Sequence, residues 1–425
     1  MKTLEEVAAS LQGYDPQALR ADTAAAFLET LVTPVVQTEM VELKAALGRV
    51  VARDVVSPID VPAHDNSAMD GFAFRGELLQ AGQPLRLSIA GTALAGKAWT
   101  GTIGPDQCLK IMTGAVMPAG LDTVVPQEMV QLQGEAITIP AGALRLGDNR
   151  RFKGEDLAMG KPALLAGSTV GPAAMGLLAS LNIAKVEVQR KVRVAFFSTG
   201  DEVLSLGDTP REGAVYDSNR YTLFGLLTRM GVEVMDMGVV KDDPQALEAA
   251  FLDAAGRADA IITSGGVSVG EADHTKAVMR RLAGGNGGVV FWKIAMRPGR
   301  PMAVGRIGPA ILFGLPGNPV AVMVTFLAFV RPALLRMMGT EARPQPLLKA
   351  RSTEAIRKKP GRTEFQRAIV ETTAEKTLQV RTTGQQGSGV LSSMAVANGL
   401  LVLHHDQGNV AIGEEVDVLM FEGVI

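Results

Sequence analysis

The sequence predicts an α/β multidomain protein, in which a central doubly wound α/β domain is joined to a helical linker domain, an inserted β domain and a C-terminal β-barrel-like domain. The 425 residues exceed one ordinary domain, and a 47% hydrophobic content can supply several cores. Between residues 190 and 340, short apolar runs alternate with amphipathic helical segments, which is typical of parallel sheets with crossover helices. On either side of that stretch, apolar residues alternate singly, as in small β domains.

Four domains are predicted from these changes of pattern. Helical spacing of Phe27, Leu28 and Leu31, and again of Val41, Leu43 and Ala46, indicates helices before the first β region. The predicted domains are a helical linker (20–57 with 157–180), an inserted mostly-β domain (58–156), an α/β substrate-binding domain that could include residues 1–19 (181–340) and a C-terminal β domain (341–425).

Local patterns predict the elements of the α/β domain. Continuous apolar runs predict buried strands near 192–197, 232–235, 260–263 and 310–313. Helical spacing predicts helices near 223–230, 244–251, 275–282 and 319–338. Asp243 followed by Pro244 is typical of an N-cap and first helical position, and Gly231 is a helix stop. Between Val130 and Ile139, two short alternating segments predict a hairpin.

Composition excludes several classes of partner and site. The 42 basic residues nearly balance the 44 acidic ones, so neither nucleic acid nor an anionic membrane is expected as a partner. One cysteine and four scattered histidines give no zinc spacing and no disulfide, as in a reducing compartment. The segment 1–10 lacks the apolar core of a signal peptide, and the longest apolar run, 319–330, is shorter than the about 20 residues of a membrane span. We expect a cytoplasmic protein.

Three glycine-rich loops follow predicted strands of the α/β domain. They cover residues 198–202, 263–273 and 314–319. Because the carboxyl ends of parallel strands share one edge of a sheet, the loops should converge, and their free N–H groups suit an anion. One such loop alone would be an ordinary tight turn. Three that carry polar side chains favour a ligand site, although neither a Walker sequence nor a dinucleotide fingerprint is present.

Acidic and basic side chains are predicted near the same edge. The acids are Glu202, Asp217, Asp242, Asp243 and Asp273, and the cations are Lys276, Lys293, Arg297 and Arg300. Carboxylates of this kind hold Mg²⁺ against substrate oxygens, although Asp243 and Asp273 could equally cap helices. Surface exposure is the usual explanation for the cations, but a Pro-Gly turn between Arg297 and Arg300 is unusual for a plain surface. The combination suits a negatively charged substrate bridged by a metal.

Other polar segments are less informative by themselves. Residues 65–71 are crowded with turn formers, and 150–156 form a charged run that a solvated linker would explain equally well. No histidine has a convincing partner, and the single Cys108 lies in a strand-like context, so a nucleophilic triad is not supported.

Taken together, these segments resemble the molybdopterin molybdenumtransferase family, which includes the C-terminal domain of gephyrin. The matching strings occur in the family's order from about residue 20 to 420 and are DVPAHDNSAMDGFA, IMTGAVMPAG, RFKGEDLAMG, FFSTGDEV, YDSNR, DDPQAL, TSGGVSVGEADHTK, MRPGRP, GLPGNPV, PGRTEFQRA and TTGQQGSG. Departures from the family pattern are Arg297 and Arg300, where lysine is frequent, and His64 and Phe72, where an aromatic residue and tyrosine are common.

The resemblance implies a fold and an activity. It implies a central domain shared with molybdopterin adenylyltransferases, and an elongated homodimer with the active site at the subunit interface. The implied substrates are molybdate and adenylylated molybdopterin, with Mg²⁺ as cofactor and AMP as a product. Implied partners are a molybdopterin adenylyltransferase and the molybdoenzymes, or their chaperones, that receive the cofactor.

The resemblance and the loops together give a predicted set of site residues. Predicted catalytic residues are Glu202, Asp65, Thr113, Asp156, Lys293 and Arg297. Predicted binding residues are Ser264, Gly265, Gly266, Asp273, Lys276, Gly317, Asn318, Arg367 and Ser388. Predicted metal ligands are Asp242, Asp273 and Glu202.

Three alternatives stay open at this point. The first is an adenylyltransferase acting on the same pterin, although that shorter family lacks the two β domains and the GLPGNPV and GRTEFQR segments. The second is a non-catalytic cofactor-binding scaffold, which the intact motif acids disfavour. The third is tungstate in place of molybdate, because the two oxyanions are close in size and charge.

Overall fold

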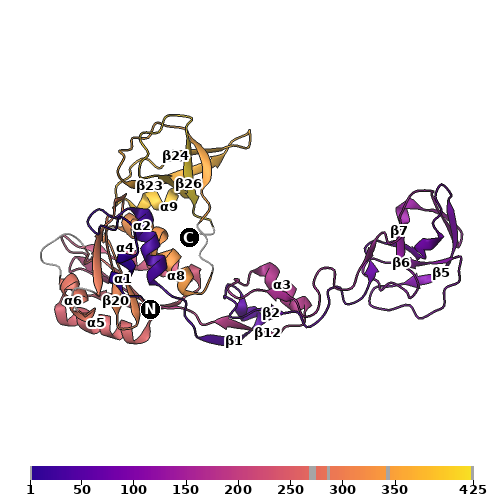
Figure 1. The fold of residues 1–425 in the computed structure, drawn as a ribbon. Helices are drawn as coiled ribbons and strands as arrows, with labels where there is room; N and C mark the ends of the chain where they lie inside the picture. The colour runs from indigo at the N-terminus through magenta and orange to yellow at the C-terminus, as the bar shows by residue number, and fades with distance from the viewer. Residues whose placement is uncertain (1, 268–273, 285–287, 341–344, 423–425) are drawn as a thin grey trace.

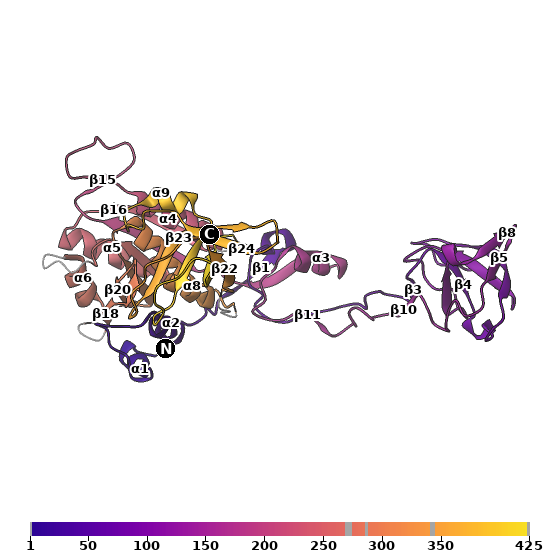
Figure 2. The same cartoon turned by 90° about the horizontal axis from the view of Figure 1, so that it is seen from above.

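The molecule is elongated, with its domains arranged along one direction. The computed structural model describes residues 2–267, 274–284, 288–340 and 345–422. The α/β domain and the C-terminal β domain lie together at one end, a small linker domain lies in the middle, and the inserted β domain lies at the other end (Figure 1, Figure 2).

The α/β domain contains a six-stranded mixed sheet covered on both faces. In spatial order its strands are β16 (Glu233–Val240), β13 (Arg193–Thr199), β17 (Ala260–Ser264), β21 (Ala310–Leu315), β20 (Pro301–Ile307) and β18 (Val289–Lys293). The first four are parallel, and β20 and β18 are antiparallel to their neighbours. Along β13, Val194 and Phe196 join one core, whereas Ala195 and Phe197 join the core of the opposite face. A strand buried on both faces confirms the doubly wound prediction.

Helices of the two faces begin and end at the predicted signals. One face is covered by α4 (Ser218–Met230), α7 (Pro319–Thr325), a π segment (Phe326–Val330) and α8 (Arg331–Met337), and the other by α5 (Pro244–Arg257) and α6 (His274–Leu282). The Asp243 carboxylate accepts from two backbone N–H groups of α5, which confirms the N-cap. Gly231 ends α4 in the left-handed conformation.

The run 319–337 forms a continuous apolar helix. By length and composition it is the one described helix that could cross a membrane, but 78% of its most apolar window is buried inside the protein. It is a core helix, as its apolar stretch predicted.

Of the two N-terminal helices, α2 differs from the predicted domain assignment. Helix α2 (Ala21–Leu31) is predicted in the linker, yet Phe27 packs edge-on against Trp292 at 5.1 Å, inside the main core of the α/β domain. Leu4 and Val7 of α1 (Leu4–Ala9) are buried in the same core, in agreement with the prediction that the α/β domain could include residues 1–19.

The predicted helix near 41–46 is also wrong. Residues Thr38–Glu42 form β1, which pairs antiparallel with β12 (Lys185–Gln189), and a 3₁₀ turn follows at Leu43–Ala46. Val41 and Leu43 fit a two-residue period as well as a helical one, and pairing with residues more than 140 positions away decided between them. Residues 185–189 therefore lie in the linker rather than in the α/β domain.

Short strand pairs lead from the linker to the inserted domain. The linker also contains α3 (Pro172–Ser180) and the pair β2 (Val55–Val56) with β11 (Pro162–Leu164). At the neck of the inserted domain, β3 (Asn66–Ser67) pairs with β10 (Arg150–Arg151). The six strands beyond it are, in order, β7 (Thr123–Pro126), β4 (Gly71–Phe74), β6 (Gln107–Ile111), β5 (Leu85–Ala93), β9 (Ala136–Ile139) and β8 (Gln131–Gln133), with 3₁₀ turns at Gly76–Leu78 and Gln127–Met129. The pair β8–β9 is the predicted hairpin.

The C-terminal domain is a closed five-stranded barrel, as predicted. Around the barrel the strands are β23 (Thr363–Thr372), β24 (Leu378–Thr382), β22 (Leu348–Ser352), β26 (Glu415–Met420) and β25 (Gly399–Leu403). Pairing of β23 with β25 closes it, and α9 (Leu391–Val396) lies outside. The short strand β19 (Met296–Arg297) of the α/β domain pairs with β23, so the barrel is attached beside Arg297.

Candidate functional site

The principal cavity lies where the α/β domain meets the barrel. It has a volume of about 910 Å³ and collects residues from all three glycine-rich loops, from the segment 296–301 and from a loop of the barrel. Its lining includes Thr199, Gly200, Glu202, Asp242, Gly265, Gly266, Thr275, Arg297, Arg300, Gly317, Asn318, Gln386, Gly387 and Ser388. The loops after β13, β17 and β21 therefore meet at one edge of the sheet, as the sequence predicts.

Glycine is required where two of these loops touch. Gly265 has a φ of +93°, and a Cβ there would lie 2.4 Å from the Thr199 carbonyl oxygen. Gly266 has a φ of +66°, and a Cβ there would lie 2.5 Å from the Thr275 side chain. No side chain could be added without separating the loops. These glycines bring backbone from neighbouring strands close enough to form one wall.

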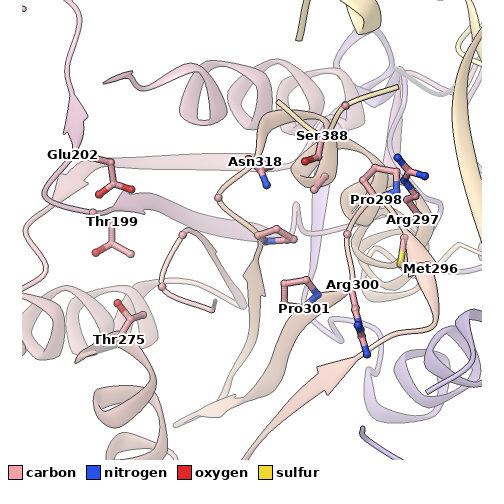
Figure 3. Close-up of a pocket in the computed structure, with 18 of the residues that line it drawn as sticks. Thr199, Glu202, Thr275, Met296, Arg297, Pro298, Arg300, Pro301, Asn318 and Ser388 are labelled. Carbon is pink, nitrogen blue, oxygen red and sulfur yellow. The ribbon is translucent and has the colours of Figure 1, made fainter. Parts of the chain in front are cut away.

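One side of the cavity is acidic. Glu202 and Asp242 line it, and the Thr275 hydroxyl donates to Asp242 Oδ1 at 3.4 Å. The hydroxyl of Thr199 is buried and has no hydrogen-bond partner among the described residues. Figure 3 shows Glu202, Thr199 and Thr275 together on this side. Two carboxylates and two hydroxyls are the hard oxygen donors that Mg²⁺ prefers, with substrate oxygens completing its shell.

The predicted metal site is only partly described. Asp273, its third predicted ligand and a predicted binding residue, lies outside the described residues. Among the residues that the structure does describe, no group of three histidine, cysteine, aspartate or glutamate side chains could hold a metal ion. Of the three predicted ligands, Glu202 and Asp242 are the two that the described part of the chain brings together.

The opposite side of the cavity is basic. Arg297 and Arg300 are exposed there and flank a turn made by Pro298 and Gly299, and Figure 3 shows both across the cavity from Glu202. Gly299 has a φ of +93°, and a Cβ there would lie 2.4 Å from the Thr325 hydroxyl. The turn is thereby pressed against the buried apolar helix. Two guanidinium groups held by such a turn can bind an oxyanion with several donors.

A barrel loop completes the cavity, and Arg367 holds that loop. The Arg367 side chain is fully buried and was predicted to bind ligand, but it does not line the cavity. Its guanidinium donates to the carbonyls of Gln385 (3.0 Å) and Gly387 (2.8 Å) and to the Ser393 hydroxyl (2.8 Å). Burial, and secondarily the positive charge of Arg297, lowers the pKa of Arg367. The prediction is corrected: Arg367 supports the loop from behind.

Two further contacts fix this loop. The Gln386 amide both accepts from the Arg367 N–H (2.8 Å) and donates to the Arg367 carbonyl (3.1 Å). The Ser388 carbonyl accepts from the N–H of Val320, in the first turn of α7 (3.1 Å). Ser388 and Asn318 therefore lie beside one another in the cavity, between its acidic and basic sides (Figure 3).

Two predicted cations lie outside the principal cavity. Lys293 lines a neighbouring cavity of about 310 Å³ together with Arg300 and Arg362, and Arg300 is shared by both. Lys276 lies on α6, with its Nζ 6.0 Å from the centre of the Phe291 ring. Lys276 is not among the residues that line either cavity, so its contact with a ligand stays a prediction.

A second large cavity adjoins the first and holds residues that the sequence reasoning missed. It measures about 580 Å³, shares Thr199, Glu202, Gly317 and Asn318 with the first, and is lined by the predicted Ser264. It also contains Asn219, whose amide donates to the Ser264 hydroxyl and the Gly317 carbonyl, both at 2.7 Å. The YDSNR string was the available signal for Asn219, and TTGQQGSG was the signal for Gln386.

The three predicted residues of the inserted domain are remote from both cavities. Asp65 accepts from the Lys153 N–H (2.7 Å) and from Arg150 Nε (3.0 Å), which lower the pKa of its carboxyl group. Thr113 donates its N–H and its hydroxyl to Asp70, and Asp156 is exposed. Asp65 adjoins the neck strand β3, far from the sheet edge (Figure 2). One chain alone does not bring these three residues to either cavity, and their predicted place in a site at a subunit interface stays a prediction.

Comparison with known families matches this domain pattern. Residues 19–182 match the MoeA N-terminal region (domain I and II), residues 195–336 a probable molybdopterin binding domain, and residues 349–421 the MoeA C-terminal region (domain IV). The second match contains all three glycine-rich loops, and the third contains the barrel loop.

Similar proteins cover nearly the whole chain. A molybdopterin molybdenumtransferase of Haemophilus influenzae is 40% identical over 94% of this chain and 97% of the relative. One of Bacillus subtilis is 33% identical over 90% of each. Among solved structures, a molybdopterin biosynthesis MoeA protein from Pyrococcus horikoshii is similar with a TM-score of 0.80 and 28% identity, covering 95% of this chain and all of that one.

Proposed function

The chain belongs to the molybdopterin molybdenumtransferase family, transferases of molybdenum cofactor biosynthesis, and we propose that it inserts molybdenum from molybdate into adenylylated molybdopterin, with Mg²⁺-dependent cleavage of the adenylate and release of AMP. The observation that carries this proposal is the division of one cavity into an acidic and a basic side. Such a cavity fits a substrate that contains both a metal-bridged phosphoanhydride and a separate oxyanion.

The acidic side fits a divalent cation. Glu202 and Asp242, with Asp273 of the same predicted set, would hold Mg²⁺. The ion would supply charge neutralisation at the phosphoanhydride, which makes AMP a better leaving group. The buried Thr199 hydroxyl faces no partner in the described part of the chain and is available to a ligand oxygen. Asp242 is oriented by Thr275, so its free oxygen keeps a fixed direction.

The basic side fits molybdate. Arg297 and Arg300 supply planar donors, and Ser388 and the N–H groups of the loop at 317–318 lie between them and the acids. Molybdate held there would stand next to the pterin side of the substrate. Tungstate has the same charge and similar size, so the cavity would accept it too.

The three remote predicted residues favour a site shared between two copies. Asp65, Thr113 and Asp156 could meet the cavity only if the inserted domain of one chain reached the α/β domain of another, and the elongated shape permits this in a twofold arrangement (Figure 1). We propose a homodimer with the active site at the subunit interface. A cytoplasmic adenylyltransferase would supply the substrate, and molybdoenzymes or their chaperones would take the product.

The test is AMP release from adenylylated molybdopterin. We expect release to require molybdate and Mg²⁺ together, and to be lost in Glu202→Gln, which retains the size of the side chain. Glu212→Gln, an exposed glutamate ten residues further along the chain, is the matched control. AMP release without molybdate would contradict the coupling, and nucleotide binding without turnover would favour a scaffold.

A further inference from the structure

The second cavity has the chemistry of a site for a flat, uncharged heterocycle. Its described lining residues include no lysine, arginine or histidine, which separates it from the basic side of the first cavity. Val203, Val215 and Leu391 give it an apolar surface, and Tyr216 gives it an aromatic one. Phosphate groups would be repelled by Glu202 and Asp217, because this described lining offers them no cation. An aromatic ring with polar edges is the better occupant.

Asp217 is the least expected residue of this lining. Its side chain is only 5% exposed, yet it carries a carboxylate. Oxygen Oδ1 accepts from the Ser198 hydroxyl and from the Arg220 N–H, both at 3.0 Å, which makes Asp217 the N-cap of α4. Oxygen Oδ2 is buried and has no partner among the residues that the structure describes. A helix cap uses one oxygen, so the second is left for a ligand donor.

Asn219 brings a second acceptor without a described partner to the lining of the same cavity. Both of its amide N–H bonds are used, by Ser264 and by the Gly317 carbonyl, so the orientation of the amide is fixed. Its Oδ1 atom is buried and has no partner within the described ranges of the chain. Two acceptors with no donor of their own predict a ligand edge that is rich in N–H groups.

We propose that Asp217 and Asn219 recognise the 2-amino-4-oxopyrimidine edge of the pterin ring, whose N3–H and 2-amino groups are neighbouring donors. This inference rests on the proposed function and specifies the orientation of its substrate. The pterin lies in the cavity beside Asp217, and the anionic groups extend past Glu202 and Asp242 towards Arg297. The adenine ring also carries an amino group and is the competing occupant that the experiment separates.

The test compares two ligands by fluorescence titration of the full-length protein. One is 6-hydroxymethylpterin, and the other is the corresponding lumazine, in which a 2-oxo group replaces the 2-amino group. The wild-type protein should bind the pterin roughly tenfold or more tightly than the lumazine, because the lumazine keeps N3–H but places an oxo group against the acceptor that faced the 2-amino group and leaves it unpaired. Equal affinity for the two ligands would overturn the proposal, and this comparison needs no variant.

The protein-side test uses Asp217→Asn, since asparagine still caps a helix and has the same size. Its amide can turn an N–H towards the 2-oxo group, so the preference should fall to about one or reverse. Asp243→Asn, the same change at the N-cap of α5, should leave the ratio unchanged. An unchanged ratio in folded Asp217→Asn would overturn the proposal. So would weaker AMP binding with pterin affinity intact, which would assign the cavity to adenine.

These titrations contain neither molybdate nor Mg²⁺. A protein that fails to release AMP can therefore still pass them, and a protein that inserts molybdenum can still fail them. The two proposals are distinguished by which assay fails.

Discussion

The predicted site residues at the two ends of the molecule differ in whether their polar side chains already have hydrogen-bond partners. At the sheet edge of the α/β domain, Thr199, Asp217 and Asn219 each keep a buried oxygen that no described residue bonds. In the inserted domain, Asp65 and Asp70 are already bonded to Arg150, Lys153 and Thr113. A buried polar atom without a partner costs about 1–3 kcal/mol, so several at one place indicate a site that a ligand completes. Two buried atoms of the inserted domain, Asn66 Oδ1 and Trp99 Nε1, also lack a described partner, but the predicted site residues Asp65 and Thr113 already have theirs.

Mixing two inactive variants tests most directly whether residues from the two ends of the molecule act in one site. Glu202→Gln and Asp65→Asn should each lower AMP release by on the order of 10² or more. After the two are dissociated and reassembled together, a shared site predicts recovery to about a quarter of wild-type activity, because half of the dimers are mixed and each has one intact site.

The control for this experiment is each variant reassembled with itself, which should stay inactive. Failure of the mixture to recover, with mixed dimers demonstrated by differently sized tags, would show that the two carboxylates do not act in one interfacial site.

A substitution of Arg367 tests whether the barrel contributes to the cavity through the loop that carries Ser388. Arg367→Met removes three hydrogen bonds from a buried guanidinium, and we expect a loss of about 3 kcal/mol in unfolding free energy by denaturant titration. Since the loop carries Ser388, KM for molybdate should rise more than kcat falls. Arg381→Met, an exposed arginine of the same barrel, should change neither. Equal losses in the two variants would remove the supporting role assigned to Arg367.

Substitution of Asp65 should have a smaller, pH-dependent effect on the unfolding free energy of the inserted domain. Hydrogen bonds from Lys153 and Arg150 lower the pKa of Asp65 in the folded protein. The stabilisation is therefore present above the unfolded value of about 3.9 and is lost as the pH falls through the folded value. Asp65→Asn should cost under about 1 kcal/mol at pH 7 and nothing in strong acid. A stability difference that grows on acidification would contradict this sign.

The reactivity of Cys108 is the smallest of the expected effects, and it reports on the unfolding of the inserted domain alone. Burial raises the pKa of its thiol to about 12, so a maleimide should not react with it in the native protein at pH 7. As the sole cysteine of the chain, it should become reactive only when the inserted domain opens. In a Trp99→Phe variant, where Trp292 is the one remaining tryptophan, labelling at a denaturant concentration where the tryptophan emission is still native would show that the two ends unfold separately. Simultaneous transitions would show that they unfold as one unit.

The sequence by itself determined most of the α/β domain and its loops. Buried strands, the Asp243 cap, the Gly231 stop and the three glycine clusters are local signals, and parallel strands necessarily bring their carboxyl ends to one edge. These local signals alone therefore place Glu202, Asp242 and Asn318 together. Simple alternation of apolar residues predicted that the inserted and C-terminal regions are small β domains.

Only the tertiary structure decided the features that depend on distant partners. Pairing with β12 makes β1 a strand where a helix was predicted. Packing of Phe27 against Trp292 places α2 in the core of the α/β domain rather than in the linker. Arg367 looked like a ligand-binding residue, but burial under the Gln385–Gly387 backbone gave it a supporting role. The free oxygens of Asp217 and Asn219 could not be predicted either. Whether a polar atom has a partner depends on side chains that meet only after the chain has folded.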